Sequence, residues 1–192
     1  HYRSKLSQKV NIKVSQWCRS VKTTVRNKKR MTEYGRQSYE KQIVKRAYGV
    51  RERQFKRFFD WAQRSEGAPG EALLCLLERR LDNVVYRLKL AATRAQARQM
   101  IVHGHVIANG KKVYSPSFII SVNDEIGLAP KAEEKSGFIE TVVNKRLKSH
   151  AKVPEWLELD KKNHVGRVVR LPVRDDIQLQ VNENSIVELY SK

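Results

Sequence analysis

Apolar side chains recur at steps of three and four residues between residues 73 and 88, which is the spacing of one face of an α-helix. This face consists of Leu73, Leu77, Leu81, Val84, Val85 and Leu88. The cationic side chains that fall off it are Arg79, Arg80, Arg87 and Lys89. The pattern predicts one helix that packs its apolar face against a core, while its arginines are left to contact an anion.

A second helix and a hairpin are predicted directly after this one. Thr93 precedes the second helix and Gln96 follows three positions later, an arrangement typical of a capping box. Gly104 is well placed to end the helix. Asn109-Gly110 then separates Val106–Ala108 from Lys111–Val113, as in a tight two-residue hairpin. The stretch from residue 80 to residue 113 therefore predicts a complete small module.

The flanking segments predict further helices and strands. Before the module we expect helices over residues 38–48 and 51–64, the second with Phe55, Phe58 and Phe59 on one face. After it, residues 118–128 predict two strands joined at Asn123-Asp124. A helix over residues 139–147, a turn at 154–156, a strand over 165–171 and a terminal helix capped by Asn182 complete the series.

The chain is strongly basic, with 39 Lys and Arg against 20 Asp and Glu and a net charge of +19. Residues 1–66 carry 19 basic and 5 acidic side chains, so most of the excess lies there. Such an excess is typical of proteins with a polyanionic partner. The longest apolar run, residues 72–77, is far below the roughly 20 residues of a membrane span. A basic arm is typical either of nucleic-acid binding or of attraction to an anionic membrane, and the aromatic-rich helices behind it favour nucleic acid and no membrane.

The inventory of reactive residues predicts no enzyme. The five histidines have no Ser, Cys or carboxylate pair at motif spacing, and no phosphate-binding glycine loop occurs. His103 and His105 lie two residues apart without a third ligand, and the two cysteines, Cys18 and Cys75, form no CxxC pair. We therefore predict no catalytic residue, no metal and no cofactor.

Short motifs in the module resemble a known family. Residues 80–82 read RLD, residues 93–98 read TRAQAR and residues 103–110 read HGHVIANG. They are similar to the RNA-binding module named after the fourth protein of the small ribosomal subunit, except that Ala108 replaces the usual valine. Pseudouridine synthases, a tyrosyl-tRNA synthetase appendix and a heat-shock RNA binder also carry this module, so the module alone leaves several protein classes open.

The flanks narrow the resemblance to the ribosomal family of bacterial type. Upstream, the family's EKQ, YGV and ERQF motifs match residues 40–42, 48–50 and 52–55; downstream, its PxWLE and IVExYSK motifs match residues 154–158 and 186–192. The resemblance covers the chain from about residue 33 onward. The cysteine cluster that binds metal near the start of many relatives is lacking here.

The resemblance implies an α+β fold with four sections. These are a basic arm over residues 1–31, an all-helical domain over 32–78, the helix-helix-hairpin RNA-binding module over 79–140, and an extension over 141–192 that completes an antiparallel sheet with further helices. The arm is expected to become ordered against RNA.

The function that the resemblance implies is that of a structural ribosomal component. Such a protein would bind small-subunit ribosomal RNA at a multi-helix junction, nucleate assembly of the subunit body and contribute to translational accuracy. Its expected partners are this RNA, neighbouring ribosomal proteins and messenger RNA where it enters the subunit, in the cytoplasm of a bacterium or in an organellar ribosome. The alternatives are an RNA-modifying enzyme or a ribosome-recycling factor tethered by the same module.

Within the enzyme alternative, Asp82 would correspond to the nucleophile of pseudouridine synthases, but its mid-helix position beside apolar residues favours pairing with a nearby arginine or a backbone group. Arg94 and Arg98, four residues apart, could meet one ridge of phosphates, the alternative being a solvated charged face. The predicted RNA-binding residues are Arg36, Lys41, Lys45, Arg46, Arg53, Lys56, Arg57, Arg79, Arg80, Arg87, Thr93, Arg94, Arg98, Gln99, His103, Lys111 and Lys112.

Overall fold

The computed structural model describes residues 31–130, 153–161 and 163–191. These residues form helices α2 (Glu33–Tyr48), α3 (Glu52–Arg64), α4 (Pro69–Glu78), α5 (Leu81–Arg87), α6 (Arg94–Val102) and α10 (Glu183–Ser191), a short 3-10 helix η2 (Arg174–Asp176), and strands β1 (Val106–Ala108), β2 (Lys111–Lys112), β3 (Glu125–Leu128), β4 (Leu157–Asp160) and β5 (Val165–Val168). The predicted α+β class is confirmed. The chain divides into residues 1–36 and 37–192, and the contacts described below lie within the second unit.

The strands form one antiparallel sheet in the order β2-β1-β3-β5-β4. The predicted hairpin is confirmed: Ala108 pairs with Lys111 across the turn, and Asn109 and Gly110 have positive φ angles of 50° and 74°. Such angles at both central residues are those of a tight hairpin turn that follows the twist of the strands. Lys111 and Lys112 are therefore held on a short, exposed strand.

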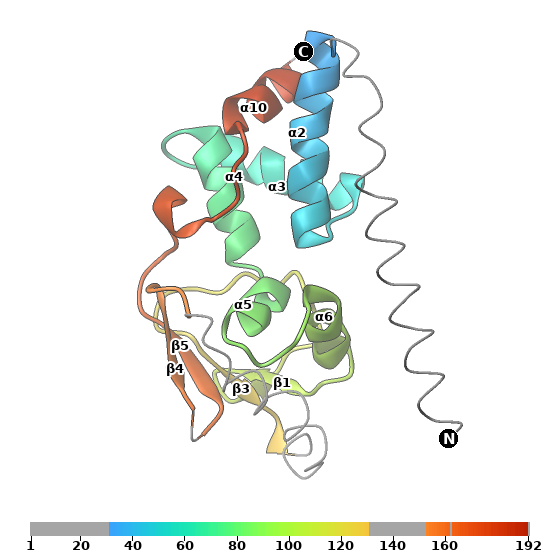
Figure 1. Ribbon diagram of the computed structural model, residues 1–192. Helices are drawn as coiled ribbons and strands as arrows, with labels where there is room; N and C mark the ends of the chain where they lie inside the picture. Colours follow the sequence, from blue (N-terminus) through green and yellow to red (C-terminus); the bar gives the residue numbers. More distant parts are fainter. Residues whose placement is uncertain (1–30, 131–152, 162, 192) are drawn as a thin grey trace, which may run out of the picture. The chain divides into compact units, whose positions relative to one another are not determined.

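Two hydrophobic clusters form the core. In the first, α5 and α6 pack on the sheet (Figure 1), and its members include Leu81, Val84, Val85, Leu88, Ile101, Val106, Ile120, Ile126, Trp156 and Val168. The second lies among α2, α3, α4 and α10 and contains Val44, Tyr48, Phe55, Phe58, Phe59, Leu73, Leu74, Leu77, Ile177 and Ile186. The three phenylalanines that were expected on one face of a helix are all buried in this second cluster.

The single helix predicted over residues 73–88 is wrong, because the chain breaks it into α4 and α5 at Arg79 and Arg80. Arg80 is extended, with φ −64° and ψ 137°. The N–H groups of Leu81 and Asp82 donate to the carbonyls of residues 118 and 116 instead of continuing the helical ladder. Consequently the apolar positions up to residue 77 enter the second cluster, and those from residue 81 enter the first.

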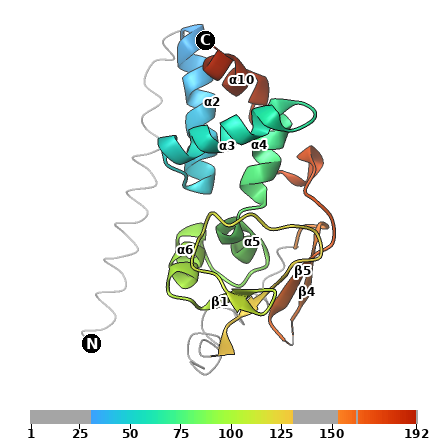
Figure 2. The same ribbon diagram turned by 180° about the vertical axis from the view of Figure 1, so that it is seen from behind.

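The segment between β2 and β3 is irregular and passes over α5 (Figure 2). Only Ile119 bridges to Arg80 within it, so the strand predicted before Asn123 does not form. Asn123 turns the chain with a φ of 67°, and only the second predicted strand, β3, is present. The segment's carbonyl groups are used to start α5, which is why it does not pair as a strand.

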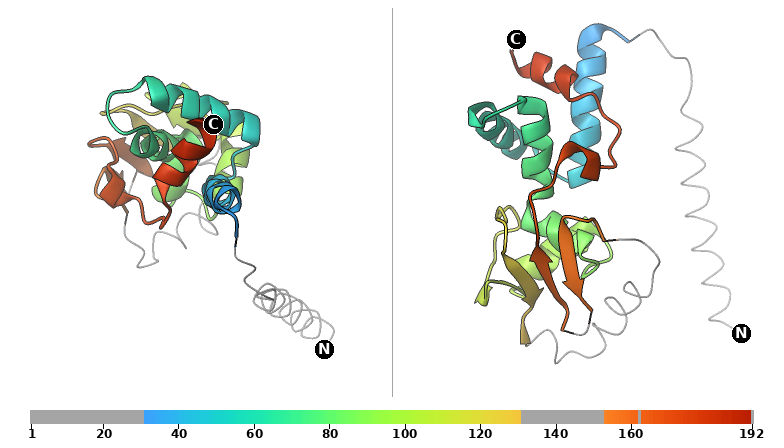
Figure 3. Two further views of the ribbon diagram at one scale, coloured as in Figure 1. Left: turned by 90° about the horizontal axis from the view of Figure 1, so that it is seen from above. Right: turned by 90° about the vertical axis from the view of Figure 1, so that its left-hand side faces the viewer.

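The last part of the chain contributes residues to both hydrophobic clusters. Strand β5 confirms the strand predicted over residues 165–171 but ends at Val168, whereas β4 was not predicted. From β5 the chain runs back to the helices through η2 and ends in α10 beside α4 (Figure 3). Asn182 Oδ1 accepts from the backbone N–H groups of Asn184 and Ser185, as expected of a cap. The helix predicted over residues 139–147 lies outside the described residues.

Candidate nucleic-acid interface

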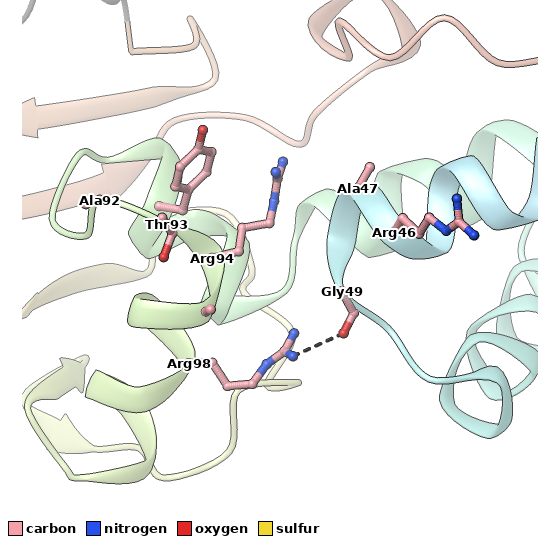
Figure 4. Close-up of a pocket in the computed structure, with 9 residues that line it drawn as sticks. Arg46, Ala47, Gly49, Ala92, Thr93, Arg94 and Arg98 are labelled. Atoms are coloured by element: carbon pink, nitrogen blue, oxygen red, sulfur yellow. Dashed lines mark hydrogen bonds between the residues drawn. The ribbon is translucent and has the colours of Figure 1, made fainter. Parts of the chain in front are cut away.

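A pocket of about 320 Å³ lies where the end of α2 meets the start of α6. Its polar lining comes from Arg46 of α2 and from Thr93, Arg94 and Arg98 of α6 and its cap. Figure 4 shows Arg94 and Arg98 reaching from α6 toward the end of α2, while Arg46 extends away from them. We call this the arginine pocket. Four of the predicted RNA-binding residues therefore line one depression.

The position of α6 is fixed by local capping. Thr93 is extended and its hydroxyl oxygen accepts a 3.1 Å hydrogen bond from Gln96 N–H. The Gln96 side-chain oxygen in turn accepts a 2.7 Å bond from the N–H of Ala92. The predicted capping box is thus present in altered form, since the glutamine reaches one residue before the cap. At its other end the helix stops at Gly104, whose φ is +70°, as predicted.

Arg94 is held on three sides. Its Nε donates a 2.8 Å hydrogen bond to Oδ1 of Asn83 on α5. Its guanidinium carbon lies 4.6 Å from the ring centroid of Tyr86 and 5.2 Å from that of Tyr48, both within the range of cation–π attraction. Among the residues that the structure describes, its two terminal nitrogens have no hydrogen-bond partner.

Arg98 plays a different part, because its nitrogens are used within the protein. Nη2 lies 2.7 Å from Oδ2 of Asp82, and Nη1 donates a 3.0 Å bond to the carbonyl of Gly49. The side chain remains 36% exposed. Arg98 thus ties α6 to α5 and to the end of α2, and one edge of it still faces the arginine pocket.

Three other predicted arginines are engaged inside the protein. Arg80 is buried, with a bidentate pairing to the Asp82 carboxylate, and its Nη1 has no partner among the described residues. Arg87 pairs with the buried Glu78 carboxylate, and Arg79 donates to the carbonyl of Ile120. Because Arg80 lies inside the protein, we leave it out of the interface proposed below. Asp82 pairs with arginines, as expected from its position.

The predicted residues on α2 and α3 are not brought into the arginine pocket, apart from Arg46. Lys41 and Lys45 pair with Glu52, which also accepts from the Tyr190 hydroxyl. Partial burial alone would raise the pKa of Glu52, but the hydrogen bonds from Lys41, Lys45 and Tyr190 outweigh it and lower the pKa to about 2. The remaining residues of the predicted set are exposed: Arg36, Arg53, Lys56, Arg57, Gln99, His103, Lys111 and Lys112.

Comparison with known proteins identifies the family of the chain. Residues 79–126 match the S4 domain, and residues 3–78 match the Ribosomal protein S4/S9 N-terminal domain. The protein named "Small ribosomal subunit protein uS4" from Thermoanaerobacter sp. (strain X514) is 53% identical over 165 residues, covering 86% of this chain and 78% of the relative. The chain belongs to the uS4 family. Proteins of the same name from Caldicellulosiruptor saccharolyticus and Aquifex aeolicus are 50% and 49% identical, with the same coverage.

Membership of the uS4 family confirms the resemblance seen in the motifs. The family is one of ribosomal proteins, so the prediction of a structural, non-enzymatic ribosomal protein is confirmed. Neither alternative, an RNA-modifying enzyme or a ribosome-recycling factor, is favoured. In this uS4 protein Asp82 is buried and its carboxylate is paired with Arg80 and Arg98. A nucleophile has to be accessible to its substrate, whereas this carboxylate is buried and paired.

Behind the arginine pocket, the uS4 chain carries a buried polar network that sequence reasoning missed. Its centre is Glu78, which is 1% exposed. The Glu78 carboxylate accepts from the hydroxyl of Tyr48, from Nδ2 of Asn83 and from the guanidinium of Arg87. Burial first, and then the neighbouring Glu78 carboxylate, raise the pKa of the Tyr48 hydroxyl. The available signal was the placement of Glu78 and Asn83 beside apolar positions of the first predicted helix.

Within the described residues of this uS4 protein, no group of three or more His, Cys, Asp or Glu side chains could hold a metal ion. The rings of His103 and His105 lie 6.2 Å apart. None of the described helices has both the length and the apolar character needed to cross a membrane.

Proposed function

We propose that this chain is a structural component of the small ribosomal subunit that binds small-subunit ribosomal RNA at a multi-helix junction. The observation that carries the proposal is the arginine pocket, where Arg94 presents two unpaired terminal nitrogens from a guanidinium fixed by its neighbours. Family membership supplies the ribosomal context, since the relatives are named small ribosomal subunit proteins.

The chemistry of the pocket suits a phosphate group. A guanidinium offers parallel N–H donors that match two phosphate oxygens, and it stays charged at any physiological pH. Folded RNA junctions crowd such phosphates and 2′-hydroxyls together, so a rigid set of donors recognises shape without reading bases. Arg46 and Thr93 also line this pocket.

Exposed cations outside the pocket extend the proposed surface. Lys111 and Lys112 stand on the rigid hairpin, while Arg53, Lys56 and Arg57 lie on the exposed side of α3. Lysines act chiefly by neutralising phosphates, and each neutralised phosphate adds to the salt dependence of binding. We assign to these residues a positioning and neutralising role, and to Arg94 the oriented contact.

We further infer roles in the assembled particle from the same family relation. By binding a junction early, the protein would nucleate assembly of the subunit body, contact neighbouring ribosomal proteins and lie where messenger RNA enters the subunit, contributing to translational accuracy. The compartment would be the bacterial cytoplasm, with an organellar ribosome as the alternative.

The proposal is tested by titrating a junction fragment of small-subunit ribosomal RNA with matched double variants. Lys111→Ala/Lys112→Ala removes two charges from the proposed surface, and Lys161→Ala/Arg167→Ala removes two exposed charges elsewhere. The first pair should lower the log-log salt slope by roughly 0.7–0.9 per lost contact, and the second pair should leave it unchanged. Equal slopes for the two pairs would remove the hairpin from the interface.

A second arm tests recognition of folded RNA. The wild-type protein should prefer the junction fragment to an unstructured RNA of equal length, because its donors are fixed in space. Arg94→Ala should lower the affinity for the junction fragment more than it lowers the affinity for the unstructured RNA. Equal affinity of the wild-type protein for both RNAs would overturn the proposal.

A further inference from the structure

We propose that Asn83, itself held by the buried Glu78 carboxylate, is a positioning residue that fixes the Arg94 guanidinium for an RNA phosphate. The inference rests on the proposed function and deepens it by assigning the part of the site that lies behind the RNA-binding surface. Neither Asn83 nor Glu78 faces the ligand in this assignment. They act through Arg94.

The orientation of the Asn83 amide is settled by its partners. Asn83 is 1% exposed, and its Nδ2 lies 2.9 Å from the backbone carbonyl of Glu78 and 2.6 Å from the Glu78 side-chain Oε2. Both neighbours are acceptors, so only the amide nitrogen can face them. Oδ1 must therefore face the opposite way, where it accepts the 2.8 Å hydrogen bond from Arg94 Nε.

Glu78 is in turn held rigidly. Besides Asn83, its carboxylate accepts 2.7 Å hydrogen bonds from the Tyr48 hydroxyl and from Arg87 Nη2. A change of rotamer at Glu78 would break these buried hydrogen bonds, so the carboxylate keeps one orientation. The series Glu78, Asn83 and Arg94 is thus continuous from a buried anion to the pocket, and each step has one orientation.

The consequence for Arg94 is a guanidinium with a defined free edge. Asn83 Oδ1 accepts the hydrogen bond from Arg94 Nε, and the ring centroids of Tyr86 and Tyr48 lie 4.6 and 5.2 Å from the guanidinium carbon. The terminal nitrogens remain as a pair of donors for two oxygens of one phosphate. A side chain fixed before binding loses little rotamer freedom when the ligand arrives, which favours affinity. Lysine at this position lacks the Nε–H that Asn83 holds.

The first test needs no RNA. In a nitrogen–proton correlation spectrum, the Arg94 Nε–H signal, assigned by its absence in Arg94→Lys, should be shifted by the neighbouring rings and slow to exchange with solvent. In Asn83→Ala the signal should move toward that of an exposed arginine and exchange faster. Val84→Ala, a truncation at the adjacent buried position that leaves Arg94's partners intact, is the matched control. An unchanged Nε–H signal in Asn83→Ala would overturn the inference.

The second test is a double-mutant cycle on affinity for the junction RNA. Asn83→Ala should weaken binding about tenfold in the wild-type background, as expected for loss of a charge-assisted hydrogen bond. It should have no effect in the Arg94→Ala background, because Asn83 acts only through Arg94. Equal loss in both backgrounds would show that Asn83 acts by general destabilisation and would sink the inference.

The failure of this inference is distinguishable from failure of the proposed function. If Arg94→Ala leaves junction binding unchanged, the arginine pocket is not the RNA site and the proposed function loses its support. If Arg94→Ala weakens binding and Asn83→Ala does not, only the positioning role falls. Should Asn83→Ala fail to fold, Arg94→Lys decides instead: it keeps the charge and the Asn83–Glu78 pair, and wild-type affinity in that variant would refute the need for an oriented guanidinium.

Discussion

The carbonyl oxygen of Gly49 accepts a 3.0 Å hydrogen bond from Nη1 of Arg98, 49 residues further along the chain. The same guanidinium pairs with Asp82 through Nη2. One side chain therefore joins the end of α2 to both helices of the RNA-binding module. This contact helps to hold together the two parts of the proposed RNA surface that meet at the arginine pocket.

Replacing Arg98 by Ala should destabilise the fold by about 1–3 kcal/mol, because the buried Asp82 loses one of its two cationic partners and two backbone carbonyls lose a donor. Urea unfolding followed by circular dichroism measures the loss. Gln99→Ala, at the next and exposed position of α6, is the control and should fall within about 0.5 kcal/mol of wild type. Equal midpoints for the two variants would contradict the role of Arg98 as a structural tie.

Removal of the Glu78 carboxylate should be the most damaging of the polar substitutions. Glu78→Ala leaves the buried Tyr48 hydroxyl, the Asn83 amide and the Arg87 guanidinium without their shared acceptor, at an expected cost of about 3–5 kcal/mol. Glu71→Ala, an exposed carboxylate on the same helix, should have little effect. Thermal unfolding distinguishes them, and a Glu78→Ala protein as stable as Glu71→Ala would refute the network's importance.

Glu52 gives a prediction for the dependence of stability on pH. Its pKa is lowered from the ordinary 4.5 to about 2, so its stabilising effect is complete above pH 4.5 and is lost as the pH falls toward 2. Because the Glu52 side chain is 49% exposed, solvent screening limits the effect to about 1 kcal/mol. Wild type should exceed Glu52→Gln in unfolding free energy by that amount at pH 6, and the difference should shrink steadily between pH 4.5 and 2.5. A pH-independent difference would contradict the assignment.

Gly166 on β5 tests the packing of the first hydrophobic cluster. A methyl group there would lie 2.4 Å from both Cδ atoms of the fully buried Leu88, so Gly166→Ala should overpack the core and cost about 1–3 kcal/mol. In a Leu88→Ala background the space is vacated, and the same substitution should cost much less. Chemical denaturation of the four proteins in this cycle measures the coupling, and additive effects would show that the two positions do not meet.

Features decided by neighbouring residues could be predicted from the sequence. Asn109-Gly110 formed the hairpin turn, Gly104 ended α6 and Thr93 capped it, because each of these signals acts over a few residues. Strand β4 carried an alternating Leu157, Leu159 pattern that was overlooked, so its signal was present in the sequence.

Features decided by distant residues could not be predicted. The break between α4 and α5 exists because the carbonyls of residues 116 and 118 supply acceptors from another part of the chain. Residues 79–80 contain no glycine or proline that would have indicated this break in the helix. For the same reason, arginines 79, 80 and 87 resembled an RNA-binding face in the sequence, whereas their partners in the fold are internal.

Residues 177–191 complete the hydrophobic cluster begun by α2, α3 and α4, with Ile177 and Ile186 buried in it. Synthesis proceeds from the first residue onward, so the faces of Phe55 and Phe59 emerge from the ribosome long before their covering helix exists. During that interval the nascent helices have an incomplete core. Helices α2, α3 and α4 therefore reach their final packing only after residues 177–191 have been made.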